Sequence, residues 1–409
     1  MTHTCRFCDA PLSHSFIDLG MSPLANSYVS PNDTAAEPFF PLCAYVCQTC
    51  LLVQLPVHES AAKIFDDYAY FSSYSDSWLR HAQSYVEQVT ERFGFGVTTQ
   101  VVELASNDGY LLQYFKARGI PVLGIEPARN VASVAQERGI ETIVKYFGQQ
   151  TAQELAASGR RADLLIGNNV LAHVPDLNDF VAGMKTLLSP GGIITIEFPH
   201  LMQLVNHCQF DTIYHEHFSY FSFLVVAGVF AHHGLRVFDV EELPTHGGSL
   251  RVYACHEQNG ALADTVRVAG LLQRESSEGY DDFARYLTFE PRVRSLKQSI
   301  VTFMDTVRRE GNSIAGYGAA AKGNTLLNYC GIDRSLMEYV VDRSPHKQGM
   351  LLPGTHIPIR GPAAIAQAHP DYLVILPWNI KDEIMEQMAY VREWGCKFVT
   401  FIPDVKVHP

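Results

Sequence analysis

Two C-x-x-C pairs near the start of the chain constrain its fold more than any other feature. Cys5 and Cys8 form the first pair, and Cys47 and Cys50 form the second. Each pair suits a tight turn that points two thiolates at one tetrahedral ion, so together they predict a four-cysteine zinc site. Cys43 lies nearby and could replace one ligand; ordinary buried or redox thiols are the alternative. Four thiolates leave no open coordination position, so the predicted zinc is structural.

Composition and charge narrow the class of protein. The chain has 409 residues, of which 47% are hydrophobic, enough for two or three packed domains. Its net charge of −12 argues against nucleic acid or an anionic membrane as a partner, although a local basic pocket could still hold a diphosphate. No apolar run approaches the roughly 18 residues of a membrane span, and the first residues lack a signal-peptide core. Nine cysteines, an odd number, suit a reducing compartment, so we expect a soluble cytoplasmic protein.

From residue 100 the pattern changes to alternating strands and helices. Residues 101–104 predict a buried strand, and the small residues that follow predict a tight turn where backbone amides approach a ligand at a helix N-terminus. The next strand, residues 122–125, ends at Glu126, whose carboxylate can accept both ribose hydroxyls of an adenosine. A third strand, residues 163–167, precedes Asn168 and Asn169 at the sheet edge where ligands of α/β proteins collect. The predicted cofactor-binding residues are Glu103, Ala105, Asn107, Gly109, Glu126, Asn168 and Asn169.

The layout of this region resembles that of Rossmann-like S-adenosylmethionine (SAM) methyltransferases. A Pro-Gly-Gly turn at residues 190–192 precedes a late strand, as is frequent in those enzymes. The first turn is not G-x-G-x-x-G, so a dinucleotide cofactor is only weakly supported. A generic α/β domain without a cofactor is the alternative.

The C-terminal part predicts a second, smaller doubly wound unit after a helical stretch at residues 264–311. Residues 313–325 read as a strand, a glycine turn and a helix start, where Lys322 favours an anionic group such as a diphosphate. Further strands end at Asp342 and just before Trp378, which could stack on a nucleobase or simply pack. His246, in a His-Gly-Gly turn, could approach substrate or cofactor, or merely close a hairpin. The predicted substrate-binding residues are His246, Gly318, Lys322, Asn324 and Trp378.

The run Tyr214, His215, Glu216 and His217 carries the candidate chemistry. A neutral imidazole is a suitable base near pH 7, so His217 is the predicted general base. Glu216 could orient an imidazole or bind a substrate hydroxyl, and Tyr214 could donate to a developing enolate oxygen. In a strand these side chains would alternate between two faces, so we expect an irregular loop. A metal pair, His215 and His217, or a plain polar turn is the alternative.

Two further positions are candidates for the same site. His173 follows the third strand and could act as an acid or base, or be a satisfied loop histidine. Tyr68 and Tyr70 lie between the cysteine region and the α/β region, and either could reach the cleft or pack as a linker.

Taken together, these segments resemble the sugar 3-C-methyltransferases of unusual deoxysugar biosynthesis. The similarity runs through nearly the whole chain and includes the paired cysteines, Tyr-x-Tyr-x-Ser-Ser, Tyr-x-Glu-His-Phe, His-Gly-Gly and Gly-Tyr-Gly-Ala-x-x-Lys. It implies an α/β protein of three parts: a zinc module at 1–66, a SAM domain at 67–262, and a helical connector with a nucleotide-sugar domain at 263–409. The family's substrate is a thymidine-diphosphate-linked 4-keto deoxysugar. Its functional residues match Tyr70, His173, Tyr214, Glu216 and His217, with His217 as the base; where a relative carries Asp, this chain has His215.

The predicted reaction is methylation of C3, in which His217 removes the proton that the 4-keto group acidifies. Methylation of a sugar oxygen is one alternative, since it too could use a histidine base. A second is an NAD-dependent oxidoreductase or epimerase with Asp342 on the ribose, and a third is a zinc-ribbon adaptor that only senses nucleotides.

Overall fold

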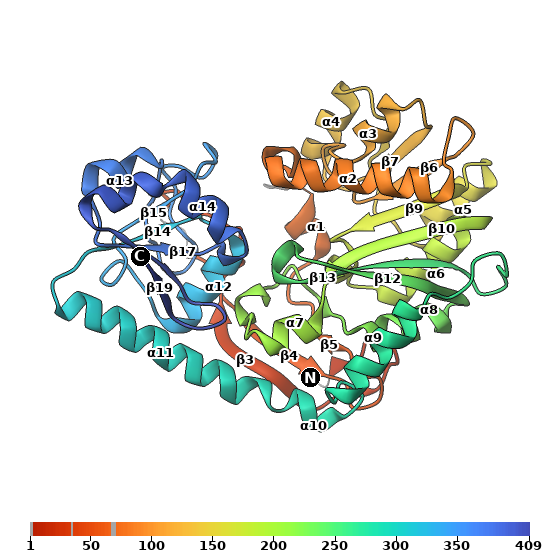
Figure 1. The fold of residues 1–409 in the computed structure, drawn as a ribbon. Coiled ribbons are helices and arrows are strands. Elements are labelled where there is room, and N and C mark those ends of the chain that lie inside the picture. The colour runs from red at the N-terminus through yellow and green to blue at the C-terminus, as the bar shows by residue number, and fades with distance from the viewer. Residues whose placement is uncertain (1–2, 34–35, 67–70) are drawn as a thin grey trace.

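A computed structural model describes residues 3–33, 36–66 and 71–409. The described chain forms an N-terminal module, a middle unit and a C-terminal unit, and the long helix α11 (Phe289–Arg309) runs beneath the C-terminal unit and the N-terminal module in the view of Figure 1. This mixed α/β architecture confirms the predicted fold class.

The N-terminal module is built on a four-stranded antiparallel sheet of order β11-β5-β4-β3, beside a small β1–β2 hairpin. Its elements are β1 (His3–Thr4), β2 (Pro11–Leu12), β3 (His14–Ser22), β4 (Phe40–Val46), β5 (Val53–Gln54) and α1 (Ala61–Phe65). The edge strand β11 (Ser219–Tyr220) comes from the middle of the sequence and pairs with β5. A segment that follows the Tyr-His-Glu-His run is therefore part of the N-terminal sheet.

The middle unit contains a seven-stranded sheet of order β12-β13-β10-β9-β6-β7-β8, in which β13 is antiparallel to its neighbours. Its strands are β6 (Val101–Leu104), β7 (Val122–Ile125), β8 (Thr142–Ile143), β9 (Ala162–Asn168), β10 (Leu188–Pro199), β12 (Leu235–Leu243) and β13 (Ser249–His256). Its helices are α2 (Asp76–Phe93), α3 (Leu112–Ala117), α4 (Arg129–Glu137), α5 (Gln149–Ala157), α6 (Leu177–Leu187), α7 (Leu201–Asn206) and α8 (Phe223–His232), with short 3-10 turns η1 (Ser72–Tyr74), η2 (Leu171–His173), η3 (Phe210–Thr212) and η4 (Thr245–Gly247). All four residues of β6 are buried, because helices cover both faces of this mostly parallel sheet.

The C-terminal unit contains a six-stranded sheet of order β16-β15-β14-β17-β18-β19, parallel except for β19. Its strands are β14 (Ile314–Tyr317), β15 (Val340–Val341), β16 (Ile359–Arg360), β17 (Tyr372–Ile375), β18 (Lys397–Thr400) and β19 (Lys406–His408). Its helices are α12 (Ala321–Cys330), α13 (Ala363–Ala368) and α14 (Lys381–Gln387), with η5 (Trp378–Ile380) and η6 (Ala389–Trp394). The chain leaves β14 toward β15 on one side and later toward β17 on the other, so the edge beyond β14 and β17 is a topological switch point.

The three units share a hydrophobic core. Helices α9 (Val266–Ser277), α10 (Phe283–Tyr286) and α11 (Phe289–Arg309) lie in the stretch 264–311 that the sequence predicts to be helical. Phe289, at the start of α11, stacks on Phe16 of β3 with ring centroids 4.7 Å apart. One continuous cluster of buried side chains includes β3, α7, α11 and the C-terminal sheet. Within the described ranges, no helix combines the length and apolarity of a membrane span.

Candidate active site

The carboxylate of Glu126 fixes the turn that follows β6, the first strand of the middle unit. Its Oε2 accepts from the backbone N–H of Asn107 at 2.8 Å, and its Oε1 accepts from that of Ala128 at 2.9 Å. Burial raises the pKa of Glu126 to about 6, and these two N–H groups oppose the rise. Ala105, Asn107 and Gly109 all have positive φ angles (54°, 48° and 76°). At Gly109 a Cβ would lie 2.4 Å from Ile140, so this tight turn requires glycine.

Buried polar atoms without a partner gather at the carboxyl ends of β6 and β9. Glu103 is 1% exposed and Asn168 is 9% exposed. Within the described part of the chain, Glu103 Oε2, both polar side-chain atoms of Asn168 and Asn169 Oδ1 have no hydrogen-bond partner. Buried polar groups are normally paired, so these atoms fit a polar ligand at this edge, as the predicted SAM site requires. Burial and the nearby carboxylates of Glu126 and Asp108 raise the pKa of Glu103 well above its usual value.

The segment before α2 closes over this turn. The N–H of Ser72 donates to Asn107 Oδ1 at 2.9 Å, and that of Ser73 donates to Asp108 Oδ2 at 3.3 Å. The predicted site residue Tyr70, like Tyr68, lies outside the described residues. Its role stays a prediction.

The predicted irregular loop is present at the Tyr-His-Glu-His run. The N–H of His217 donates to the carbonyl oxygen of Tyr214 at 2.9 Å, so the chain turns between them. This turn brings the two rings together, with centroids 4.0 Å apart. His217 Nδ1 lies 2.8 Å from the carbonyl oxygen of Thr212 and must donate to it. Burial, with His173 nearby, lowers the pKa of His217 well below its usual value, so the ring is neutral and Nε2 carries the lone pair.

The other two members of the run point elsewhere. His215 Nε2 donates to the carbonyl oxygen of Pro41 at 3.2 Å, and its ring lies edge-on to Phe40 of β4. Glu216 Oε1 accepts from Asn26 Nδ2 at 2.6 Å. Burial raises the pKa of Glu216 to about 7, while Asn26 opposes the rise. The two imidazoles of the alternative metal pair therefore contact different carbonyl groups, that of Pro41 for His215 and that of Thr212 for His217.

His173 lies against His217. Its ring centroid is 4.8 Å from that of His217, and the two rings are nearly perpendicular. Burial lowers the pKa of His173 to about 4, so this ring is also neutral at pH 7. Its Nδ1 is buried and has no partner among the described side chains. The structure thus brings together three of the five predicted catalytic residues, His173, Tyr214 and His217.

His246 lies beside Asn169, at the carboxyl end of β9; its binding role stays a prediction. It closes the β12–β13 hairpin in a left-handed conformation, with φ of 53°. Its Nε2 accepts from Asn169 Nδ2 at 3.1 Å, and its ring centroid lies 5.4 Å from that of Trp78 on α2. Burial lowers the pKa of His246 to about 4.

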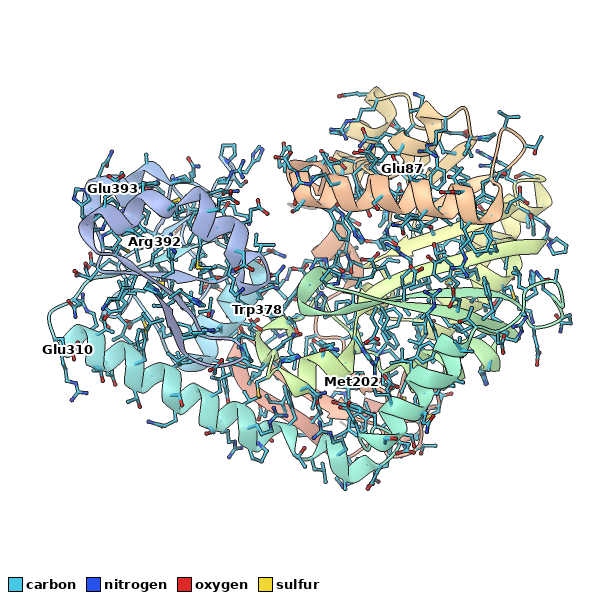
Figure 2. The ribbon with its side chains drawn as sticks, viewed as in Figure 1. Glu87, Met202, Glu310, Trp378, Arg392 and Glu393 are labelled. Atoms are coloured by element: carbon cyan, nitrogen blue, oxygen red, sulfur yellow. The ribbon has the colours of Figure 1, made fainter. Side chains whose placement is uncertain are left out.

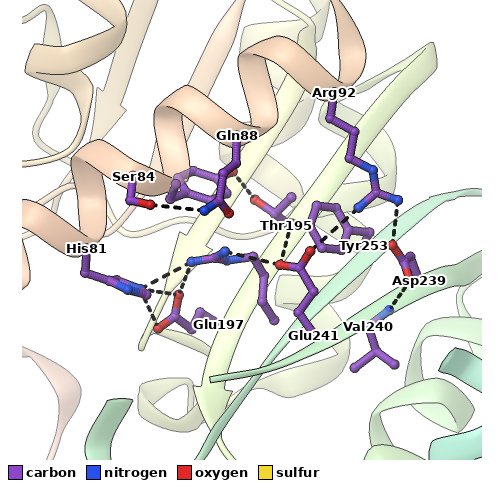
Figure 3. Close-up of polar contacts among 12 residues, drawn as sticks. His81, Ser84, Gln88, Arg92, Thr195, Glu197, Asp239, Val240, Glu241 and Tyr253 are labelled. Carbon is purple, nitrogen blue, oxygen red and sulfur yellow. Dashed lines mark hydrogen bonds and ion pairs between the residues drawn. The ribbon is translucent and has the colours of Figure 1, made fainter. Parts of the chain in front are cut away.

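Sequence reasoning missed the buried ion network beside the His246 turn. Both oxygens of Glu197 lie 3.0 Å from His81 Nε2, as Figure 3 shows, and Oε1 also accepts from Thr245 Oγ1 at 3.1 Å. Arg251 donates to the same carboxylate at 3.0 Å. Although burial opposes it, His81 and Arg251 hold the pKa of Glu197 below its usual value. The sequence signal was an acidic residue inside an otherwise apolar strand.

The C-terminal unit meets the site through Trp378, on the face turned toward the middle unit (Figure 2). Its indole N–H donates to Asp211 Oδ2 at 2.7 Å, and a Cβ on Gly247 would lie 2.3 Å from its ring. Lys322 lies 4.6 Å from the centre of the same ring and donates to Asn379 Oδ1 at 2.7 Å. Burial lowers the pKa of Lys322, and Asp211 opposes this. Trp378 thus packs between the units; its role as a platform for a nucleobase stays a prediction.

The remaining predicted substrate residues lie on the same edge. Gly318 has φ of 91°, and a Cβ there would lie 2.5 Å from the ring of Pro377. Asn324 is 2% exposed, and its Nδ2 donates to the carbonyl oxygen of Ala25 at 2.5 Å, which ties α12 to the loop after β3. Substrate binding by either residue stays a prediction.

The four-cysteine cluster has the geometry of a zinc site. The ligand sulfurs of Cys5, Cys8, Cys47 and Cys50 all lie within 4.8 Å of one another. This fits one tetrahedral ion with four thiolates, as the sequence predicts. Cys43 is not in the group, because it faces Asp18 of β3 across the β3–β4 ladder, so it does not replace a ligand.

The comparisons with known proteins cover the whole chain. C-methyltransferase NovU from Streptomyces niveus is 36% identical over 98% of this chain and 96% of its own length. Three family models match in succession: a zinc binding domain at residues 5–65, a methyltransferase domain at 78–240 and a C-methyltransferase C-terminal domain at 244–403.

Other likenesses are partial. A ubiquinone biosynthesis O-methyltransferase from Azorhizobium caulinodans is 29% identical over 24% of this chain and 39% of that protein. Among solved structures, the PH0226 protein from Pyrococcus horikoshii covers 48% of this chain and 99% of that chain, with a TM-score of 0.38 and 15% identity.

The whole-chain match and the site agree with each other. The three family models follow one another in the same order as the structural units: the module with the four cysteines, the middle unit and the C-terminal unit. These matches therefore favour a methyltransferase over the oxidoreductase and adaptor alternatives. The chain belongs to the C-methyltransferase family and is a SAM-dependent enzyme with a structural zinc site.

Proposed function

We propose that this enzyme methylates C3 of a nucleotide-linked 4-keto deoxysugar, with thymidine diphosphate as the carrier and His217 as the base. The observation that carries the proposal is the fixed tautomer of His217. Its Nδ1 proton is held by the carbonyl oxygen of Thr212, so the lone pair lies on Nε2. A neutral, fixed imidazole is the group that removal of a proton beside a carbonyl needs.

The chemistry explains why a C-methyltransferase needs a base. A carbon–carbon bond requires a carbon nucleophile, and the 4-keto group acidifies the C3 proton. His217 Nε2 takes that proton, and the electron pair of the broken C–H bond delocalises onto the keto oxygen, where Tyr214 is the predicted donor. When bound, SAM would supply the methyl group: as C3 bonds to that carbon, the methyl–sulfur bond breaks, its electron pair goes to sulfur, and S-adenosylhomocysteine leaves. Because the imidazolium and the enolate arise together, their opposite charges offset the cost of burying either one.

The nucleotide is assigned to the edge beyond β14 and β17. This edge is a switch point, where ligands of open α/β sheets bind. Gly318 lets the chain turn there, and Lys322 supplies a cation in the first turn of α12. Through Trp378 and Asp211, this edge contacts the chain that leads to Tyr214. A sugar diphosphate held there would extend its hexose toward His217.

The test is transfer of a carbon-13 methyl group from labelled SAM to a thymidine-diphosphate 4-keto-2,6-dideoxyhexose, with the product carbon located by NMR. We expect a new methyl carbon bonded to C3. A methyl group on oxygen would overturn the proposed carbon acceptor. If SAM binds but this acceptor stays unmodified, while another nucleotide sugar is methylated, the substrate assignment is wrong.

A further inference from the structure

Arg6 connects the four-cysteine cluster to the chain segments that carry His173 and His217. It lies between the ligands Cys5 and Cys8. Building on the proposed function, we propose that Arg6 is a positioning residue: it couples the four-cysteine site to the relative placement of His173 and His217.

The backbone of Arg6 is fixed on the metal side. Its N–H donates to Gln54 Oε1 at 2.9 Å, and Gln54 Nε2 donates to Cys5 Sγ at 3.1 Å. Gln54 is 1% exposed and lies in β5. The side chain that contacts a zinc ligand therefore also fixes the residue beside that ligand. Four thiolates around one Zn²⁺ carry a net charge of about −2, so a guanidinium next to them is favoured.

The guanidinium of Arg6 reaches both histidine segments. One nitrogen donates to the carbonyl oxygen of Pro175 at 3.0 Å, two residues after His173. The other donates to the carbonyl oxygen of Leu55, directly after β5. The same group lies 5.6 Å from the ring centre of Phe218, the residue after His217. One side chain thus contacts neighbours of both histidines.

Backbone hydrogen bonds complete this connection. The N–H of Leu55 donates to the carbonyl oxygen of Phe218 at 3.0 Å, next to the β5–β11 pairing. The N–H of Phe218 donates in turn to the carbonyl oxygen of Ala172 at 2.7 Å. The segments of His173 and His217 are therefore bonded to each other and to the strand that Arg6 holds. The turn with Asn107 and Glu126 is not in this set of contacts.

Small displacements of a base are costly, because a shift of about 1 Å can lower a rate by roughly a hundredfold. Lysine at position 6 keeps the positive charge but cannot donate to two carbonyl groups in a fixed fork. We therefore expect Arg6→Lys to lower kcat by at least about tenfold. The KM and dissociation constant for SAM should change by less than about threefold, and zinc content should be unchanged.

The matched control is Arg161→Lys. Arg161 also donates to two backbone carbonyl groups, those of Thr186 at 2.7 Å and Leu188 at 3.3 Å, but it lies at the amino end of β9, away from the site. Its kcat should stay within about twofold of the natural enzyme. An equal loss of kcat in both variants would mean a general effect of lost arginine packing and would overturn the proposal.

Hydrogen exchange followed by mass spectrometry supplies a readout that does not depend on any substrate. In Arg6→Lys, amide exchange should speed up in the peptides covering 171–176 and 214–221 and stay unchanged in 101–109. Unchanged exchange in the two histidine peptides overturns the inference, even if activity falls. Suppose that exchange changes as expected but the natural enzyme itself transfers no methyl group to the nucleotide sugar. The inference about Arg6 would then stand, and the proposed function would be contradicted.

If Arg6→Lys does not fold, stepwise chelation of zinc from the natural full-length enzyme tests the same coupling. The histidine peptides should lose protection before the peptide covering 101–109. Simultaneous loss in all three peptides, or earlier loss in 101–109, would overturn the proposal.

Discussion

The middle and C-terminal units use a carboxylate in the same way at the same topological position. Glu126 follows β7, Asp342 follows β15, and each strand is the neighbour of its sheet's first strand. Glu126 accepts from the N–H groups of Asn107 and Ala128. Asp342 accepts from those of Ala319 and Ser344, both at 2.8 Å. In both units the carboxylate holds the turn that follows the first strand of the sheet.

The surroundings of the two carboxylates differ. Lys347 Nζ lies 3.8 Å from Asp342 and donates to the carbonyl oxygen of Ala319 at 2.8 Å. Tyr28, from the N-terminal module, donates to that same carbonyl oxygen at 2.6 Å. The turn that Glu126 holds also has a cation, Arg138, but this residue contacts Asp108, at 3.0 Å from its carbonyl oxygen, rather than Glu126. Buried polar atoms near Glu126 lack partners among the described residues. Equal topology therefore does not mean equal function: the Glu126 turn suits an added adenosine, whereas Tyr28 and Lys347 cover the Asp342 turn on the β14–β15 side of its sheet, beside the β14–β17 switch point assigned to the substrate nucleotide.

The largest effect is expected at the base between the two edges. His217→Asn should lower turnover by about 10³-fold or more, because general-base catalysis typically contributes 10²–10⁴. The dissociation constant for SAM should be unchanged. His215→Asn is the control from the same turn, since its side chain faces Pro41, and we expect it to retain turnover within a few fold. Turnover by His217→Asn near that of the natural enzyme would remove His217 from the role of base.

The N-terminal module contributes to the Asp342 turn, because its Tyr28 donates to the carbonyl oxygen of Ala319. Cys47→Ser should abolish stoichiometric zinc and lower the melting temperature by roughly 10 °C or more, since a structural zinc supplies on the order of 10 kcal/mol. Cys43→Ser is the matched control and should keep one zinc per chain, because Cys43 lies outside the cluster. Metal analysis and calorimetry decide this. Full zinc content in Cys47→Ser would contradict the four-thiolate site.

The two carboxylates can be compared directly by SAM binding. Glu126→Gln should weaken binding by about tenfold or more, because a neutral amide accepts ribose hydroxyls less strongly than a carboxylate. Asp342→Asn should leave the SAM dissociation constant within about twofold. Calorimetry on both variants measures the difference. Equal weakening of SAM binding by both variants would show that Glu126 contributes no more to the SAM site than Asp342 does.

A smaller effect is expected from pH. The pKa of Glu126 is raised to about 6 by burial, so this carboxylate is ionised at pH 7 and mostly protonated at pH 5. Binding that requires the ionised form is lost as pH falls through 6, which predicts about tenfold weaker SAM binding at pH 5 than at pH 7. Glu126→Gln should remove most of this dependence. An undiminished dependence in that variant would assign it to another group, such as Glu103.

Local sequence patterns were sufficient for the elements of the fold and for part of the site. The buried run at 101–104 and the strand ending at Glu126 predicted β6 and β7, because buried parallel strands are nearly continuous apolar runs, with Glu103 as the exception here. The alternation of side chains along a strand predicted that the Tyr-His-Glu-His run must be an irregular turn. Both predictions depend only on residues that are close in sequence.

Contacts between distant segments could not be predicted in this way. Nothing near Asn26 indicates that its amide binds Glu216, and nothing near Ser219 indicates that it pairs with Gln54 of the zinc module. Arg6 appears as an ordinary residue between two ligands until Pro175 and Leu55 are placed around it. Such contacts depend on how three units pack around one core.

The most direct test of the central claim is deuterium exchange at C3 of a thymidine-diphosphate 4-keto-2,6-dideoxyhexose, measured by NMR in deuterium oxide without SAM. If His217 forms an enolate before methyl transfer, the natural enzyme should wash deuterium into C3, and His217→Asn should not exceed the enzyme-free rate. Exchange by His217→Asn at the rate of the natural enzyme would contradict the assigned base. No exchange by the natural enzyme, with binding of the sugar nucleotide verified, would contradict the enolate mechanism itself.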